Sequence, residues 1–231
     1  MLFPSAAILA LVTDAAERTF GASYFAEAYG PHYARRNPPR KWRAFLREIA
    51  RFRTAGDLLD VGCAYGLFLR EASRLYRCGG CDISAHALGV ARRLLPPEIP
   101  LFAARLGELP TGRRYDIVTC FDILEHVSDL DRALADVRAH LRPGGILVAT
   151  MPVYDGPLGW LVDRLDHDET HVHRRGRDFW MQRFGAHFTV RRCTGIWRYF
   201  ALHRWYLNVV SRATRRVTPA ILLVAERTEG P

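Results

Sequence analysis

The stretch from Leu58 to Leu69 constrains the fold of this chain more than any other segment. An apolar run suited to a buried strand leads into a turn of small residues between Gly62 and Gly66, and a helical pattern follows. Asp82 lies twenty positions after Gly62, at the end of a second strand-like segment. A strand, a glycine turn, a helix and a later acid in this order predict a pocket for a cofactor that contains a nucleoside.

Each part of this pattern has a physical role in such a pocket. Glycines let the backbone approach a ligand closely, and the next helix points its N-terminal amides toward the same place. A carboxylate at Asp82 can accept hydrogen bonds from both hydroxyls of a ribose. The alternative is that the glycines only make a tight turn, but the ordered series of elements favours the cofactor site.

Strand and helix patterns alternate through the middle of the chain. The predicted strands cover residues 57–61, 77–83, 101–104, 115–121 and 145–151, and the predicted helices cover residues 41–52, 67–75, 84–94 and 129–140. Such alternation with short connections predicts a parallel sheet with helices on both faces. Beyond residue 152 we expect a polar loop, a helix over 177–184 and strands over 188–193 and 220–225. The segment 196–216 between these strands is predicted as an inserted helix.

The net charge of +9 is unevenly distributed along the 231 residues. Residues 172–216 carry eleven arginines and one acid, residues 31–53 carry eight basic residues and one acid, and the remainder is therefore acidic, at +9 − 10 − 7 = −8. A basic run with interleaved aromatic residues fits a solvated face, a nucleic-acid surface or a helix lying on a membrane. Among these, we favour a protein that acts on a small molecule, anionic or lipid-linked. Nucleic-acid binding is disfavoured, and peripheral contact with a membrane stays open as an alternative.

The five cysteines are odd in number, which favours a reducing compartment, and the predicted location is the cytoplasm. Cys78 and Cys81 form a lone CxxC across a predicted strand, which is typical of buried packing. The apolar run over residues 6–12 is too short to span a bilayer and is predicted to pack as a helix. The histidine- and acid-rich run from His167 to His173 matches no closed zinc pattern, so no metal site is predicted.

Four motifs in order resemble those of the class I S-adenosylmethionine-dependent methyltransferases, closest to the ubiquinone-biosynthesis and small-molecule branch. They are residues 58–66, Asp82, residues 115–127 around the sequence FDILEHV, and residues 141–147. The resemblance implies an α/β fold with a Rossmann-like, doubly wound, seven-stranded sheet, mostly parallel with one antiparallel strand. We expect a helical arm or lid over residues 1–40 and a methyltransferase domain over residues 41–231, with a basic aromatic insertion at about 196–216.

The resemblance also implies roles for particular residues around S-adenosylmethionine. Asp60 would lie near the methionine amino group, and Asp82 with Ile83 would hold the ribose and adenine. Arg105 stands where many relatives have an aspartate, so the backbone of Leu106 would contact the adenine instead. The other residues expected at the cofactor are Gly62, Cys63, Ala64, Gly66, Cys120 and Phe121.

Methyl transfer requires that the acceptor atom be positioned against the methyl group. Where the acceptor must lose a proton, it also requires a general base. His126, after the fourth main strand, and His171, in a later loop, are the candidates, with a structural role for His126 as the alternative. The predicted function is transfer of a methyl group to an oxygen, nitrogen or carbon of a small molecule. The alternatives are a cofactor-binding module that docks on RNA or a membrane through its basic segments, and an RNA methyltransferase.

Overall fold

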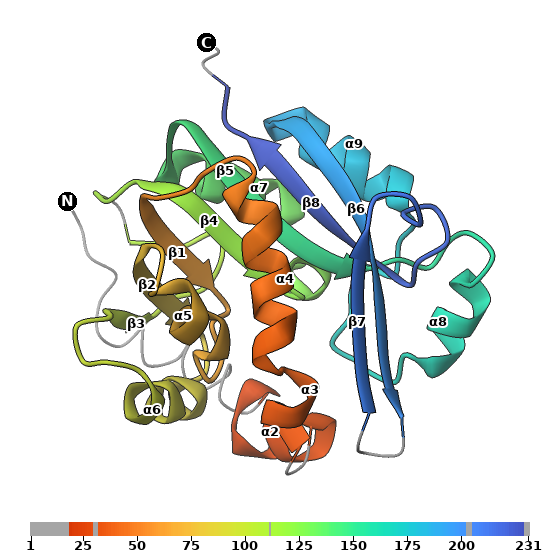
Figure 1. Ribbon diagram of the computed structural model, residues 1–231, viewed down its shortest axis with the longest axis horizontal. Helices are drawn as coiled ribbons and strands as arrows, with labels where there is room; N and C mark the ends of the chain where they lie inside the picture. The colour runs from red at the N-terminus through yellow and green to blue at the C-terminus, as the bar shows by residue number, and fades with distance from the viewer. Residues whose placement is uncertain (1–18, 30–31, 111, 202–204, 229–231) are drawn as a thin grey trace.

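The computed structural model describes residues 19–29, 32–110, 112–201 and 205–228. Within them one eight-stranded sheet has the order β3-β2-β1-β4-β5-β8-β6-β7 (Figure 1). The strands are β1 (Asp57–Val61), β2 (Arg77–Asp82), β3 (Leu101–Ala103), β4 (Tyr115–Phe121), β5 (Leu141–Pro152), β6 (Thr189–Ala201), β7 (Trp205–Ser211) and β8 (Ala220–Glu226). The helices are α2 (Ala22–Tyr29), α3 (Tyr33–Arg36), α4 (Pro39–Ala50), α5 (Leu67–Ala72), α6 (Ala85–Leu94), the 3-10 turn η2 (Leu124–His126), α7 (Leu130–His140), α8 (Gly159–Leu165) and α9 (Arg177–His187).

The sheet is parallel across its first five strands and antiparallel at its other edge. Strands β1 to β5 pair in parallel, whereas β8 pairs antiparallel with both β5 and β6, and β6 pairs antiparallel with β7. Strands β7 and β8 therefore run against the other strands of the described sheet. The predicted Rossmann-like α/β architecture is confirmed, but the prediction of seven strands with one antiparallel strand is wrong.

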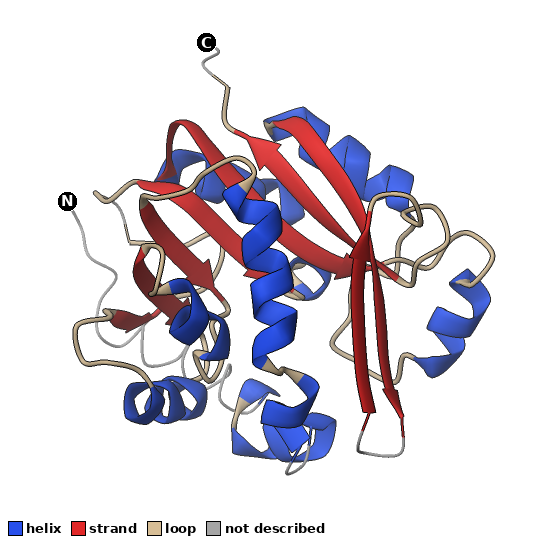
Figure 2. Ribbon diagram, viewed as in Figure 1, coloured by secondary structure: helices blue, strands red, loops and turns tan. Residues whose placement is uncertain are grey.

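The extra strand comes from the segment that the sequence analysis assigned to an inserted helix, and that assignment is wrong. Strand β6 continues past Cys193, and β7 returns beside it as a hairpin, with Ile196 opposite Val210 and Trp197 opposite Val209 (Figure 2). β-Branched and aromatic residues at these positions favour a pleated strand. Ile196 is fully buried, so this part of the hairpin packs against the core.

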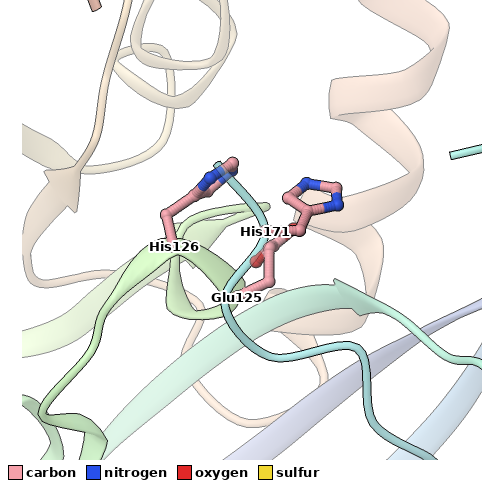
Figure 3. Close-up of side chains that lie close together, drawn as sticks. All are labelled: Glu125, His126 and His171. Carbon is pink, nitrogen blue, oxygen red and sulfur yellow. The ribbon is translucent and has the colours of Figure 1, made fainter. Parts of the chain in front are cut away.

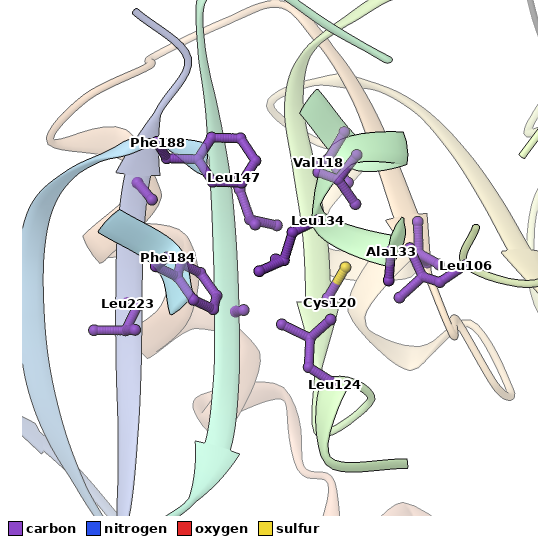
Figure 4. Close-up of a cluster of buried hydrophobic side chains, with 14 of the residues drawn as sticks. Leu106, Val118, Cys120, Leu124, Ala133, Leu134, Leu147, Phe184, Phe188 and Leu223 are labelled. Atoms are coloured by element: carbon purple, nitrogen blue, oxygen red, sulfur yellow. The ribbon is translucent and has the colours of Figure 1, made fainter. Parts of the chain in front are cut away.

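Two layers of helices cover the sheet, because neighbouring residues of each central strand face opposite sides. Leu59 packs in a cluster with α7 and α9, and Leu58 packs with α4, α5 and α6. Figure 4 shows part of the first cluster, where Leu134 from α7 and Phe184 from α9 meet the sheet around Leu147. This packing fixes the carboxyl ends of β1, β2 and β4 at one edge, where ligands bind in such folds.

The structure also bears on the predictions for the Cys78–Cys81 pair, the N-terminal residues and membrane-spanning helices. Cys78 and Cys81 lie in β2 with side chains in the clusters on opposite faces, and both thiols are free. The predicted helix at residues 6–12 lies outside the described residues, and the predicted boundary at residue 40 falls within α4. Among the described helices, none is long and apolar enough to span a bilayer.

Candidate functional site

The glycine turn follows β1 directly and uses backbone conformations that favour glycine. Gly62 has φ of 74° and Ala64 has φ of 46°. A Cβ atom on Gly62 would lie 2.1 Å from Cδ1 of Ile123, so a side chain there would push the Ile123 side chain aside and would also strain the positive φ. The N–H groups of Gly62 and Cys63 donate to the carbonyl of Cys81 at 2.8 and 3.0 Å. These bonds hold the turn against the end of β2.

Asp82 ends β2 beside this turn, and backbone amides orient its carboxylate. Oδ2 accepts a hydrogen bond from the N–H of Ala64 at 2.8 Å, and Oδ1 accepts one from the N–H of Ser84 at 2.9 Å. The residue is buried and borders a cavity. A carboxylate fixed in this way is a ready acceptor for a pair of hydroxyl groups.

Asp60 is a second buried carboxyl group at the same edge of the sheet. The hydroxyl of Thr119 donates to its Oδ1 at 2.6 Å. Burial raises the pKa of Asp60 to about 7, against the hydrogen bond from Thr119 and with a further contribution from the charge of Asp82. A cationic group bound nearby would favour the ionised form of this carboxyl.

A cavity of about 420 Å³ opens over the carboxyl ends of β1, β2 and β4. Most of the residues predicted at the cofactor line it: Asp60, Gly62, Cys63, Ala64, Asp82, Ile83, Leu106 and Phe121. Cys120 and Gly66 are not among the described lining residues. The Cys120 side chain lies in the cluster under α7 and α9, and Gly66 packs against Leu95. These two residues therefore support the edge of the sheet from outside the cavity.

Aromatic side chains line much of the rest of the cavity, and this aromatic end contains few of the residues predicted from the sequence. The aromatic rings that line it are Phe20, Tyr24, Phe25, Tyr33, Trp42, Phe68 and Phe121. Phe25 stacks on Tyr65 of the glycine turn with ring centroids 4.7 Å apart. The N-terminal segment thereby joins the site, although only its aromatic content could have signalled this from the sequence.

The two predicted catalytic histidines are brought together from separate segments. The rings of His126 in η2 and His171 in the loop after α8 have centroids 4.6 Å apart. His126 lines the aromatic end of the cavity, whereas His171 is not among the described lining residues and lies behind it. Burial lowers the pKa of His126, and the neighbouring His171 lowers it further. The His126 imidazole is therefore neutral at pH 7.

The sequence of residues 32–202 matches the family model of the methyltransferase domain. The chain belongs to this methyltransferase family. Its ordered motifs and its Rossmann-like sheet make it a class I S-adenosylmethionine-dependent methyltransferase domain.

Curated relatives resemble the central part of this methyltransferase. An N,N-dimethyltransferase for dTDP-4-amino-2,3,4,6-tetradeoxy-D-glucose from Saccharopolyspora spinosa is 29% identical over 119 residues, which cover 47% of this chain and 47% of that protein. A ubiquinone biosynthesis O-methyltransferase from Aeromonas salmonicida is 34% identical over 101 residues, which cover 41% of this chain and 42% of that protein. The chain thus spans less than half the length of either relative.

Solved structures resemble the methyltransferase over nearly its whole length. A possible histamine N-methyltransferase from Thermotoga maritima superposes with a TM-score of 0.69 at 14% identity, covering 92% of this chain and 100% of that one. The N-methyltransferase NodS from Bradyrhizobium japonicum, in complex with S-adenosylhomocysteine, gives a TM-score of 0.66 at 17% identity, covering 94% and 99%. At these identities the likeness shows the fold.

The sequence of the methyltransferase contains a single lysine, Lys41, which is buried at the aromatic end of the cavity. Its Nζ donates to Oδ1 of Asn37 at 2.8 Å and lies 4.0 Å from Oδ2 of Asp122. Arg198 from β6 donates to both oxygens of Asp122, at 2.5 and 2.9 Å. Burial lowers the pKa of Lys41 to about 7, with Arg198 adding to the shift and Asp122 opposing it.

We expect the Lys41 amine to titrate near pH 7. The folded pKa lies below the ordinary value of 10.5, so the contribution of Lys41 to stability is present above pH 10.5 and is lost as the pH falls through about 7. The methyltransferase labelled with isotopic lysine gives one lysine side chain to follow by NMR, and its chemical shift reports the pKa directly. A midpoint near 10.5 would contradict the prediction.

Asp122→Asn tests whether the neighbouring charges affect the pKa of Lys41. Asp122 favours the charged amine, so its loss is expected to lower the pKa of Lys41 further. An upward shift of the Lys41 pKa in this variant would show that Asp122 does not favour the charged amine.

Proposed function

We propose that the protein transfers a methyl group from S-adenosylmethionine to an oxygen or nitrogen atom of a small-molecule acceptor. The observation that carries this proposal is one cavity that joins the glycine turn and Asp82 to an aromatic end. The relatives lend support, because one is named for N-methylation of a nucleotide-linked amino sugar and another for O-methylation in ubiquinone biosynthesis.

The residues at the sheet edge fit the chemistry of S-adenosylmethionine. Asp82 offers an oriented acceptor for the ribose hydroxyls, and Asp60 offers a buried carboxyl group for the methionine ammonium. Ile83 and Leu106 supply apolar surface beside them for the adenine ring. Bound S-adenosylmethionine supplies a sulfonium methyl group that is already electrophilic.

At the other end, the chain's task is to bind and orient the acceptor. The rings of Trp42 and Phe121 provide flat apolar surface that excludes water from the reacting atoms. His126 is the neutral imidazole that faces this end, and we assign it and His171 to the polar machinery that acts on the acceptor nucleophile. The described part of residues 1–40 is proposed as a lid, because Phe20, Tyr24 and Tyr33 from this segment line the cavity.

Calorimetry with S-adenosylhomocysteine tests the cofactor half of this proposal. Transfer of a labelled methyl group from S-adenosylmethionine to a panel of phenols and primary amines tests the acceptor half. We expect saturable binding and methylation of at least one class of acceptor. The absence of binding by both S-adenosylmethionine and S-adenosylhomocysteine would overturn the proposal.

A further inference from the structure

Two segments far apart in the sequence bring together three side chains that can coordinate a metal ion. Glu125 and His126 lie in η2 after β4, and His171 lies in the loop after α8 (Figure 3). One ligand atom from each lies within 4.8 Å of the other two. Ligand atoms that share one ion through bonds of about 2.1 Å lie up to about 4 Å apart, so small side-chain rotations would close the site.

We infer that Glu125, His126 and His171 bind one divalent transition-metal ion. The Glu125 residue is only 1% exposed, and its Oε2 is buried with no hydrogen-bond partner among the described residues. A buried carboxyl oxygen without a hydrogen-bond partner costs free energy. A cation held between the three side chains removes this cost.

The outer contacts of the two imidazoles orient them as ligands. Nδ1 of His171 lies 2.6 Å from Oδ2 of Asp166, and Nδ1 of His126 lies 2.8 Å from Oγ1 of Thr170. Histidines that bind metals commonly give one ring nitrogen to the ion and the other to a carboxylate or other polar partner. Because these contacts occupy Nδ1 of each ring, Nε2 is the nitrogen that would bind the ion, and Asp166 would position His171.

The donor set indicates the class of ion. One carboxylate oxygen and two imidazole nitrogens suit Zn²⁺, Mn²⁺, Fe²⁺ or Co²⁺, whereas Mg²⁺ and Ca²⁺ prefer oxygen ligands throughout. Three protein ligands also leave a coordination position open for water or substrate, as in catalytic metal sites. The sequence analysis predicted no metal because it considered only the run from His167 to His173. Two of the three ligands come from η2, about 45 residues earlier in the chain.

The place of this cluster suggests what the ion does, and this step rests on the proposed function. His126 is both a ligand and a lining residue of the aromatic end, so the ion lies beside the acceptor. An acceptor hydroxyl bound to the ion would release its proton to solvent at a lower pH. The resulting oxygen anion attacks the methyl carbon, and the carbon–sulfur bond breaks with its electron pair left on sulfur.

Metal titration of the untagged, chelator-treated protein tests the inference. We expect one Zn²⁺ per chain by calorimetry, and visible absorption bands of a protein-bound ion when Co²⁺ is used. Glu125→Gln, His126→Asn and His171→Asn are each expected to abolish this binding. Asp166→Asn should weaken it by about 10- to 100-fold, as loss of an outer partner does. His167→Asn is the matched control, because His167 is exposed in the same loop and lies outside the cluster.

Thermal unfolding with and without Zn²⁺ separates binding from folding, since the ion should stabilise the wild type and His167→Asn but none of the three ligand variants. Equal Zn²⁺ affinity in the wild type and the ligand variants would overturn the inference, as would no one-to-one binding of Zn²⁺, Mn²⁺ or Co²⁺. S-adenosylhomocysteine binding is measured in parallel. Zn²⁺ binding without any S-adenosylhomocysteine binding would support the metal site while overturning the proposed methyl transfer.

Discussion

Asp82→Asn is expected to weaken S-adenosylhomocysteine binding by about 100-fold or more, because a hydrogen bond to a charged group contributes about 1.5–3 kcal/mol, and the ribose would lose one such bond and keep the other only to a neutral acceptor. The amide has one acceptor oxygen, whereas the carboxylate already receives the N–H groups of Ala64 and Ser84 on separate oxygens. The amide NH₂ would face the N–H of Ala64 or of Ser84, and two donors in contact would also disturb the turn. Titration calorimetry measures the change in affinity.

Asp131→Asn is the matched control for this variant. This variant also replaces a carboxylate by an amide, but on the surface of α7, where Asp131 pairs with Arg183 at 2.8 Å. It should bind S-adenosylhomocysteine as the wild type does, and both variants should keep the metal affinity of the wild type. Wild-type affinity in Asp82→Asn would show that the carboxylate does not contact the cofactor.

The features that sequence analysis predicted well are those that local chemistry determines. The turn after β1 needs bare backbone at Gly62, where a Cβ would clash with Ile123, and the position of Asp82 follows from the length of one helix and one strand. The alternation of elements then dictates a parallel sheet. These constraints act over some twenty residues, so the sequence displays them directly.

The hairpin of β6 and β7 was missed because its strand character depends on distant partners. Residues 196–216 mix aromatic, aliphatic and basic side chains without a clean alternation, and their length was taken as evidence for a helix. In the fold, β6 pairs with β8, and Arg198 reaches Asp122 at the end of β4. Tertiary contacts of this kind settle whether such a segment forms a strand, and they leave no mark at one place in the sequence.

The candidate site also combines residues that are close in the sequence with residues that only the fold brings together. The cavity lining at the strand ends was predicted because its residues follow three neighbouring strands. The aromatic lining was not, since it comes largely from the N-terminal segment and α4, and Arg198, which pairs with Asp122 beside it, comes from β6. His126 and His171 were singled out separately, but their proximity, and the buried Glu125 between them and the core, required the folded loop after β5.

The charged cluster in the acceptor half leads to the largest expected effect on stability. Asp122→Asn is expected to lower the free energy of unfolding by about 3 kcal/mol, the lower end of the range for breaking a buried pair, because the carboxylate is partly exposed. The amide keeps the size of the side chain, tolerates the φ of 57° at this position, and retains an oxygen for the hydroxyl of Thr150. What it removes is the negative charge between Lys41 and Arg198. Urea unfolding at pH 7 measures the difference.

The pH dependence identifies the cause of this loss. Although burial raises the pKa of Asp122, Arg198 and Lys41 lower it to about 2, below the ordinary value of 3.8. The advantage of the wild type over Asp122→Asn is therefore complete above pH 3.8 and disappears as the pH falls through about 2, so the two stability curves should converge in acid. Replacing Lys41 by methionine in the Asp122→Asn background should restore part of the loss, because the two positions share one network. Asp131→Asn, which breaks an exposed ion pair, should cost far less than Asp122→Asn. A loss in Asp122→Asn that is the same at every pH and unaffected by the Lys41 substitution would mean that packing, and not charge, holds the strand end against α4 and β6.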